Sequence, residues 1–73
     1  MIMKNRVKIS TSENYLKTYF CYTMYQYSDG RIRIIRNADK KMVYESFISE
    51  ALDDQMVKLI WTQAAACVNE DKE

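Results

Sequence analysis

The stretch YLKTYFCYTMYQYSDGRIRIIR, residues 15–36, decides the fold of this 73-residue chain. Its dipeptide Asp29-Gly30 separates two runs that are rich in aromatic and β-branched residues, 15–27 and 31–36. Asp-Gly between two runs of this kind is the strongest short-range signal for a β-hairpin. We therefore predict two antiparallel strands that are joined at this dipeptide.

The register of this hairpin decides which side chains share a face, because a shift of one residue moves every side chain to the other side. A two-residue turn would pair Ser28 with Arg31 and mix polar with apolar groups. A three-residue loop with Gly30 in a left-handed conformation pairs Met24 with Ile34 instead, and we predict this register. One face is then apolar, with Leu16, Phe20, Tyr22, Met24, Ile32 and Ile34. The other face carries tyrosines and basic side chains: Tyr15, Lys17, Tyr19, Tyr25, Tyr27, Arg31 and Arg33.

A third strand and a helix are expected to follow the hairpin. Residues 37–41 form a polar loop, and residues 42–48 alternate in polarity as a strand does. The inward set of this strand is either Val43 and Phe47 or Met42, Tyr44 and Ile48, and the loop length leaves both open. Ser49 is a good N-cap, and the acidic residues Glu50, Asp53 and Asp54 come next, where carboxylates complement a helix dipole. We predict a helix that runs to about Asn69.

The helix is expected to cover the apolar face of the sheet with an apolar stripe. At 100° per residue the centre of the stripe is Met56, Ile60, Ala64 and Cys67, and its edges are Val57, Leu59, Trp61 and Val68. Near the N-terminus, residues 7–10 read as a short additional edge strand, whereas Ser10 and Glu13 match a capping box. The expected fold class is α+β: a three-stranded antiparallel sheet, with an optional short fourth strand at the N-terminus, packed against one C-terminal helix. We expect one domain over residues 1–73, frayed at 1–6 and 70–73.

Composition places the chain among globular proteins, since 48% of its residues are apolar and 29% are charged. The net charge of +1 conceals an asymmetry. Residues 1–41 carry nine basic and three acidic groups, whereas residues 42–73 carry two basic and seven acidic groups. Such a separation either steers an oppositely charged partner toward one face or reflects two solvated elements with different surface residues.

The sequence offers little material for catalysis or for cofactor binding. It has no histidine, the commonest proton shuttle, and its two cysteines cannot supply the four ligands of a structural zinc site. One glycine is too few for a glycine-rich phosphate loop. We expect no enzyme activity, no metal and no cofactor.

The sequence also indicates where the protein resides. It shows no secretory segment, and its longest purely apolar run, residues 64–68, is far shorter than a membrane span. We therefore expect a cytoplasmic protein without a membrane partner. Cys21 and Cys67 are expected to be reduced, half-buried small hydrophobes.

The polar face of the sheet is the candidate binding surface. Its residues are Lys17, Tyr19, Tyr25, Tyr27, Arg31 and Arg33, joined by Tyr44 if the third strand turns that side chain outward. Tyrosine and arginine are the enriched anchors of protein interfaces, and the same mixture suits phosphate contacts and base stacking in nucleic acids. The alternative is a solvated face without a partner, on which tyrosine and arginine side chains stack across strands. Trp61 either caps the core or, because a domain this small has a thin stability margin, lies in a homodimer contact.

Two resemblances bear on function. In the order of its elements, the chain over residues 19–68 resembles the DNA-binding arm domain of phage-type integrases, in which a three-stranded sheet enters the major groove. In type it resembles the small single-domain proteins, anti-CRISPR proteins among them, with which phages and prophages block host machinery. The second resemblance implies a cofactor-free inhibitor or adaptor that occludes a site on a host protein complex. A small DNA- or RNA-binding regulator is the alternative, and a homodimeric structural module is a second alternative.

Overall fold

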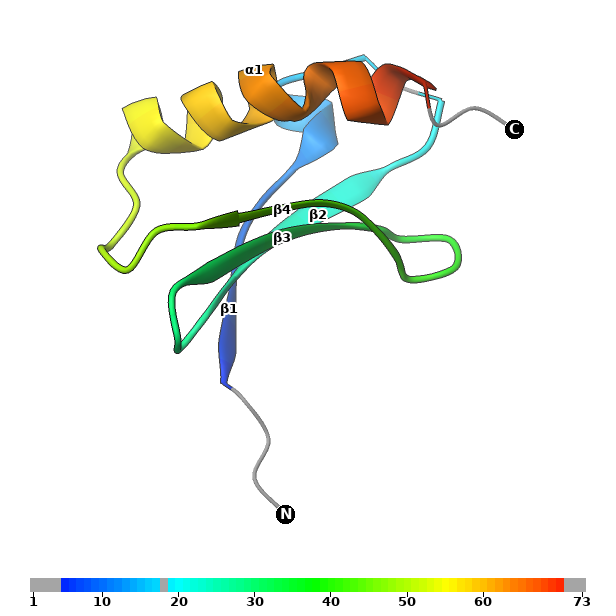
Figure 1. Cartoon of the computed structure of the whole chain (residues 1–73). Helices are drawn as coiled ribbons and strands as arrows, with labels where there is room; N and C mark the ends of the chain where they lie inside the picture. The colour runs from blue at the N-terminus through cyan, green and yellow to red at the C-terminus, as the bar shows by residue number, and fades with distance from the viewer. Residues whose placement is uncertain (1–4, 18, 71–73) are drawn as a thin grey trace.

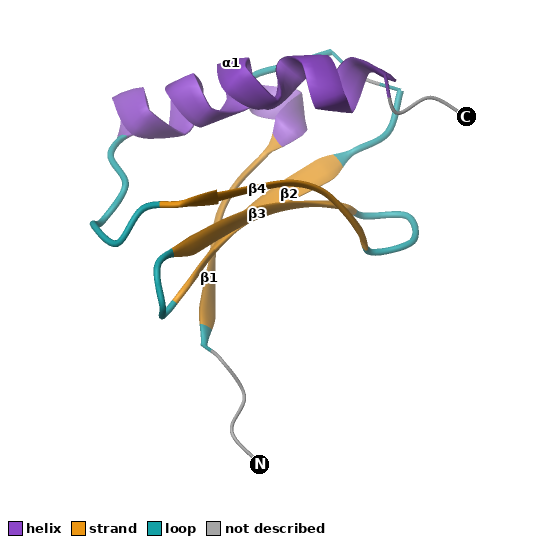
Figure 2. Ribbon diagram, in the orientation of Figure 1, coloured by secondary structure: helices purple, strands orange, loops and turns teal. Residues whose placement is uncertain are grey.

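The computed structural model describes residues 5–17 and 19–70. Its elements in chain order are β1 (Arg6–Thr11), the 3-10 turn η1 (Ser12–Asn14), β2 (Tyr22–Tyr27), β3 (Arg31–Arg36), β4 (Lys41–Phe47) and α1 (Asp54–Glu70). The strands form one antiparallel sheet in the order β1-β2-β3-β4, and α1 lies across one face of it (Figure 1, Figure 2). The α+β class with one C-terminal helix is confirmed, and the sheet contains the fourth strand that the sequence left optional.

The hairpin between β2 and β3 has the predicted register. Met24 pairs with Ile34 and Tyr25 pairs with Arg33. Gly30 has a φ of 97°, and its N–H donates a 2.9 Å hydrogen bond to the carbonyl of Tyr27. A positive φ of this kind is the reason that the loop needs glycine at its third position.

The core lies between the sheet and α1. Tyr22 and Met24 of β2 and Ile32 and Ile34 of β3 are all buried, as predicted for the apolar face. Leu16 and Phe20 also pack against this core, but they do so from the loop between η1 and β2 and not from a strand. From α1 the buried side chains are Val57, Ile60, Trp61, Ala64 and Val68.

The helix starts later than predicted and is rotated about its axis. The Asp53 carboxylate accepts a 2.9 Å hydrogen bond from the N–H of Met56, so Asp53 is the N-cap and Ser49 is not. The buried stripe includes Trp61 and Val68, whereas Cys67, predicted at its centre, is exposed. Burial of the large indole explains this rotation, because Trp61 has to turn fully toward the sheet. Over residues 5–17 and 19–70, no helix is both long and apolar enough to cross a membrane.

A bulge in β4 explains why the sequence could not fix the inward set of this strand. Tyr44 pairs with Ile34, but Met42 pairs with the next residue, Ile35, so Val43 is the extra residue. Tyr44 therefore faces the core, and Met42 and Phe47 face the opposite side. Val43 packs against the core from the bulge, so each of the two predicted sets is only partly correct.

The N-terminal segment forms the expected edge strand and then a 3-10 turn, but not the capping box, because Ser10 lies within β1 and η1 has no side-chain cap hydrogen bond. β1 pairs with β2, with Arg6 opposite Tyr27, and the turn η1 follows directly with Thr11 as its N-cap residue. The carbonyl of Asn5 accepts a hydrogen bond from the N–H of Ser28, so residues 5 and 6 belong to the paired structure although fraying was expected to residue 6. At the other end of the chain, fraying was expected from residue 70, but α1 includes Glu70. The rest of the expected frayed ends, residues 1–4 and 71–73, lies outside the described residues.

Both cysteines differ from the prediction in their exposure. Cys21 and Cys67 are free thiols, and both are exposed where half-buried side chains were expected. Cys21 lies just before β2 in an open loop, and Cys67 lies on an exposed flank of α1. Neither position is in the core.

Candidate binding surface

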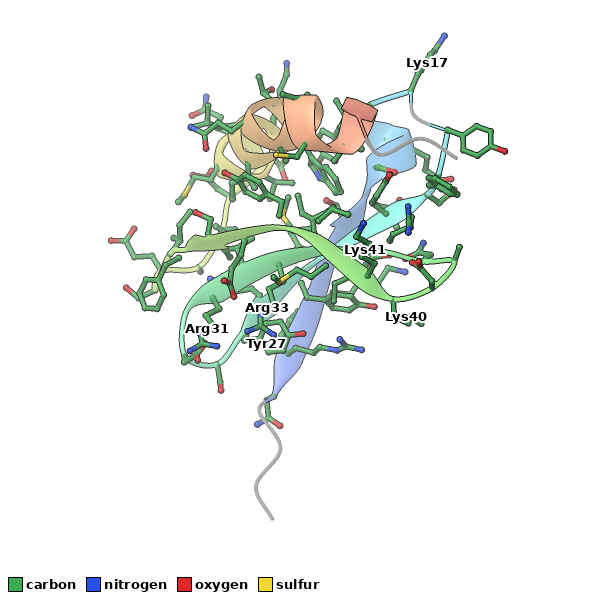
Figure 3. All side chains as sticks on the ribbon, turned by 45° about the vertical axis from the view of Figure 1, so that its right-hand side comes forward. Lys17, Tyr27, Arg31, Arg33, Lys40 and Lys41 are labelled. Atoms are coloured by element: carbon green, nitrogen blue, oxygen red, sulfur yellow. The ribbon has the colours of Figure 1, made fainter. Side chains whose placement is uncertain are left out.

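The face of the sheet opposite α1, here called the outer sheet face, carries most of the predicted binding residues. Because Ile32 and Ile34 point into the core, Arg31 and Arg33 point away from it. Figure 3 shows Arg31, Arg33 and Tyr27 on the side of the sheet that lies away from the helix. Within the described chain, no other element covers this face. Far from the β2–β3 hairpin this face carries Thr23, Ile35 and Met42. Near the hairpin its residues are Arg6 and Lys8 of β1, Tyr25 and Tyr27 of β2, Arg31 and Arg33 of β3, and Glu45 and Phe47 of β4.

The strand register arranges these eight side chains in two rows that cross the sheet. The first row is Lys8, Tyr25, Arg33 and Glu45, each opposite the next. The second row is Arg6, Tyr27, Arg31 and Phe47, in which Tyr27 and Arg31 are the residues that close the hairpin. Side chains directly opposite each other on paired strands are close enough to interact.

On the β1 side, Arg6 joins the two tyrosines. Its guanidinium carbon lies 4.0 Å from the centroid of the Tyr25 ring, which is a cation–π contact. Its Nη1 donates a 3.3 Å hydrogen bond to the Tyr27 hydroxyl. The hydrogen bond to Tyr27 is the main cause of the raised pKa of Arg6.

On the β3 side, Arg33 joins Tyr27 to β4. The guanidinium carbon lies 5.1 Å from the centroid of the Tyr27 ring, and Nε donates a 2.8 Å hydrogen bond to the Glu45 carboxylate. The hydrogen bond to Glu45 is the main cause of the raised pKa of Arg33. Arg31 forms a 3.4 Å ion pair with Asp29 of the turn. These contacts hold the polar side chains of the face in defined positions.

Four of the predicted site residues, Tyr25, Tyr27, Arg31 and Arg33, are brought together as predicted. Lys17 and Tyr19 are not on this face, because the segment before β2 is a loop and not the start of the strand. Figure 3 shows Lys17 on the helix side of the sheet, well away from Arg31 and Arg33. The aromatic rings of this loop make other contacts. Tyr15 stacks on Trp61, and Tyr19 and Phe20 form an edge-to-face pair.

Tyr44 and Trp61 also lie away from the outer sheet face. Tyr44 is on the inner face and packs against the core, because it pairs with the inward-facing Ile34. Trp61 is only 1% exposed, and its indole N–H donates to Ser10. A homodimer contact would need an exposed indole, so in this structure Trp61 is a core residue.

Sequence reasoning missed Arg6, Lys8, Glu45 and Phe47. Arg6 and Lys8 alternate with apolar residues along residues 6–9, which is the pattern of a strand with one basic face. That pattern would have identified them if the N-terminal strand had been included in the sheet. Glu45 and Phe47 could not be assigned to a face without knowledge of the bulge in β4.

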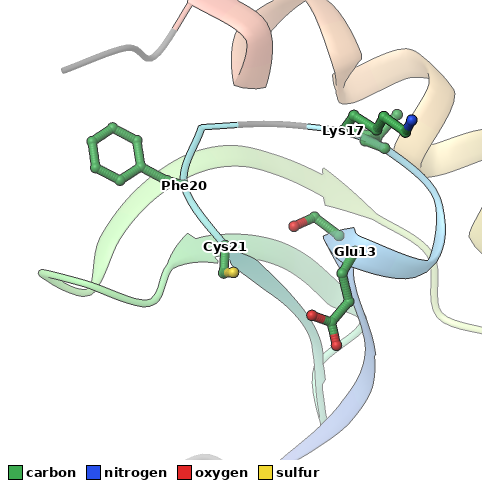
Figure 4. A pocket seen from close by; sticks show the side chains of 6 residues that line it. Glu13, Lys17, Phe20 and Cys21 are labelled. Atoms are coloured by element: carbon green, nitrogen blue, oxygen red, sulfur yellow. The ribbon is translucent and has the colours of Figure 1, made fainter.

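A second surface feature is an open recess of about 480 Å³ beside η1. Its lining residues are Ser12, Glu13, Leu16, Lys17, Phe20 and Cys21. In Figure 4 the Glu13 and Lys17 side chains point away from each other, and Phe20 points out of the loop. Ligand sites gather a few polar groups that converge on one point, and this recess does not. Over the part of the chain that the structure describes, there is also no cluster of three or more metal-binding side chains.

No family model, curated protein or solved structure matches this chain. The outer sheet face is therefore the feature from which a function can be inferred.

Proposed function

We propose that this chain is a non-enzymatic binding protein that docks its outer sheet face on a protein complex and occludes a site there. It would act as a small phage-type inhibitor or adaptor. The observation that supports the proposal is the position of Tyr25 and Tyr27 between arginines from two flanking strands. Tyrosine and arginine cover large areas, offer polar tips and dominate the energetics of protein interfaces.

The contacts within the face favour a binding role over a purely solvated surface. The guanidinium groups of Arg6 and Arg33 are each held by two partners, a ring and a hydrogen-bonding group. Side chains that are already ordered lose less conformational entropy when a partner binds, so a preorganised face binds more tightly than a flexible one.

The mixed chemistry of the face favours a protein partner over a nucleic acid. Phe47 is 63% exposed and Glu45 lies beside Arg33, so the β4 end offers an aromatic ring and a carboxylate where a phosphate backbone would need cations. Guanidinium groups also contact the rings of Tyr25 and Tyr27, and a stacking base would have to compete with them. A DNA- or RNA-binding role is therefore the alternative outcome of the test.

Photo-crosslinking in bacterial cells tests the proposal directly. The variant Phe47→p-benzoylphenylalanine places a photoreactive group on the outer sheet face, and Leu59→p-benzoylphenylalanine places the same group on the exposed side of α1. The two positions are matched in exposure, at 63% and 54%. We expect one discrete protein adduct from position 47 and none from position 59.

A pair of charge-matched variants shows whether the adduct depends on the face. Lys8→Glu/Arg31→Glu reverses two exposed cations on the outer sheet face, and Lys17→Glu/Lys58→Glu reverses two exposed cations elsewhere. Circular dichroism checks that both variants fold. The adduct should disappear in the first background and persist in the second. An adduct that forms equally in both backgrounds, or one that nuclease digestion removes, would contradict the proposal.

A further inference from the structure

The residue types on the outer sheet face change from β1 to β4, and they change in the same order in both rows. Each row begins with a cation on β1, continues with a tyrosine on β2 and an arginine on β3, and ends on β4. The ends are Glu45 in the first row and the exposed ring of Phe47 in the second. Near the β2–β3 hairpin the face is therefore basic and aromatic over three strands and acidic or apolar on the fourth.

Two carboxylates near this face pair with arginines of β3. Glu45 is on β4 beside Arg33, and Asp29 is in the β2–β3 turn beside Arg31. The sequences of β1, RVKIST, and β2, YTMYQY, contain no acidic residue. Arg6 and Lys8 are exposed on β1, so the positive charge of the face is least compensated over β1 and β2.

We infer that the partner segment is acidic, with carboxylates opposite Arg6 and Lys8 and an apolar side chain beside Phe47. This inference rests on the proposed function and names the chemistry of the partner. Complementary charge is what selects a partner at an interface, and the exposed Phe47 ring provides an apolar anchor at the other end. The segment crosses the strands and does not run along them, because the chemistry changes from strand to strand.

The width of the sheet sets the spacing that the partner must match. β1 and β4 are separated by three inter-strand steps of about 4.8 Å, or about 14 Å in total. An extended segment rises about 3.4 Å per residue, so its apolar residue lies about four positions from its acidic residues. A segment with the same composition and a different spacing fits this face less well.

A second copy of this chain is not the occupant that the charges favour. Each outer sheet face carries four cations, Arg6, Lys8, Arg31 and Arg33, against the one carboxylate of Glu45, so both faces in a contact between two copies would be net positive. Like charges placed face to face oppose association. The remaining self-contact would join this face to the acidic start of α1 in another copy, where Asp53 and Asp54 lie.

Fluorescence anisotropy with short labelled peptides at low ionic strength tests the inference. The probe is an extended, glycine- and serine-rich peptide with two glutamates separated by one residue and a leucine four positions after the first glutamate, so that all three side chains point to the same side. One control peptide has lysines in place of the glutamates, and another has the leucine directly beside them. A single-stranded oligonucleotide of the same length is the nucleic-acid control.

The wild-type protein should bind the spaced acidic peptide most tightly. Lys8→Glu/Arg31→Glu should weaken this binding at least tenfold and Phe47→Ala severalfold, whereas Lys17→Glu/Lys58→Glu should leave it unchanged. Equal affinity for the acidic and lysine peptides, or tighter binding of the oligonucleotide, overturns the inference. So does self-association in sedimentation velocity that Lys8→Glu/Arg31→Glu abolishes.

The two proposals can fail separately. If the crosslink from position 47 depends on Lys8 and Arg31 while the peptides show no preference, the proposed function stands and the acidic partner is wrong. If the crosslink is also absent, or does not depend on these residues, both are wrong.

Discussion

The indole N–H of Trp61 donates a 2.7 Å hydrogen bond to the hydroxyl of Ser10, which joins α1 to the edge strand β1. Tyr15 stacks on the same indole, with 6.1 Å between the ring centroids. β1 otherwise pairs with β2 alone, so this contact fixes an edge strand that has a neighbour on one side only. Since β1 supplies Arg6 and Lys8, the contact in the core also positions the basic end of the outer sheet face.

The variant Ser10→Ala should lower the free energy of unfolding by about 1–3 kcal/mol, because it leaves the buried indole N–H without its acceptor. Urea denaturation followed by tryptophan fluorescence measures the change. Thr62→Ala is the control, since the Thr62 hydroxyl is exposed and bonds to the Lys58 carbonyl of its own helix. That variant should stay within about 0.5 kcal/mol of wild type. Equal stabilities for the two variants would show that the hydrogen bond to Trp61 contributes little.

The variant Gly30→Ala should be strongly destabilising for two reasons that act together. The φ of 97° is unfavourable for any residue with a Cβ, and an added Cβ would lie 3.1 Å from both Cζ of Phe47 and Cα of Ser49. A strained backbone and overpacking each cost about 1–3 kcal/mol. Thermal unfolding measures the loss.

Ser28→Ala, in the same turn, is the matched control for Gly30→Ala, because Ser28 is exposed and has an ordinary negative φ. A melting temperature of Gly30→Ala that equals that of Ser28→Ala would mean that the turn can rearrange around a side chain.

The β2–β3 hairpin was predictable because a single local feature determines it. One glycine after an aspartate gives the turn, the turn gives the register, and the register places Tyr25, Tyr27, Arg31 and Arg33 on one face. These four are also the predicted site residues that the structure places on the outer sheet face. Local sequence is sufficient where the interaction that decides the structure is itself local.

The errors in the candidate site come from interactions between distant residues. The aromatic run before β2 has high strand propensity throughout, yet Tyr15 leaves the sheet to stack on Trp61, 46 positions away. Lys17 and Tyr19 leave the outer sheet face with it. The face on which Tyr44 lies could not be predicted, because the bulge at Val43 changes the face of every later residue in β4. No residue type in that segment indicates a bulge.

The ion pair between Arg36 and Asp39 should make stability depend on pH in the acid range. The Arg36 guanidinium donates two hydrogen bonds, of 2.9 and 2.6 Å, to the Asp39 carboxylate. They are the main reason that the pKa of Asp39 is lowered from 3.8 to about 2. Because the folded state favours the charged carboxylate, its stabilising effect is complete above about pH 4 and is lost as the pH falls through 2. The stability difference between wild type and Asp39→Asn should therefore be constant above pH 4 and shrink toward zero near pH 2.

Urea midpoints measured across this range check the Asp39 prediction. Ala38→Asn, in the same turn, removes no carboxylate, so its difference from wild type should be the same at every pH. A difference for Asp39→Asn that also stays constant from neutral pH down to 2 would rule out the ion pair as its origin.

Two neighbouring helix residues test the rotation of α1 that the sequence did not predict. A helical wheel places Cys67 at the centre of the apolar stripe and Val68 at its edge, because it weighs all apolar residues alike. In the structure Val68 is 2% exposed and Cys67 is exposed, because burial of the Trp61 indole turns this side of α1 toward the sheet. Val68→Ala should therefore cost about 2 kcal/mol for the two buried methyl groups and the space they leave. Cys67→Ala should change stability by less than about 0.5 kcal/mol, and the Cys67 thiol should react with a thiol reagent in the native state. The reverse order of effects in urea denaturation would show that the simple wheel was correct and that α1 lies on the sheet in a different rotation.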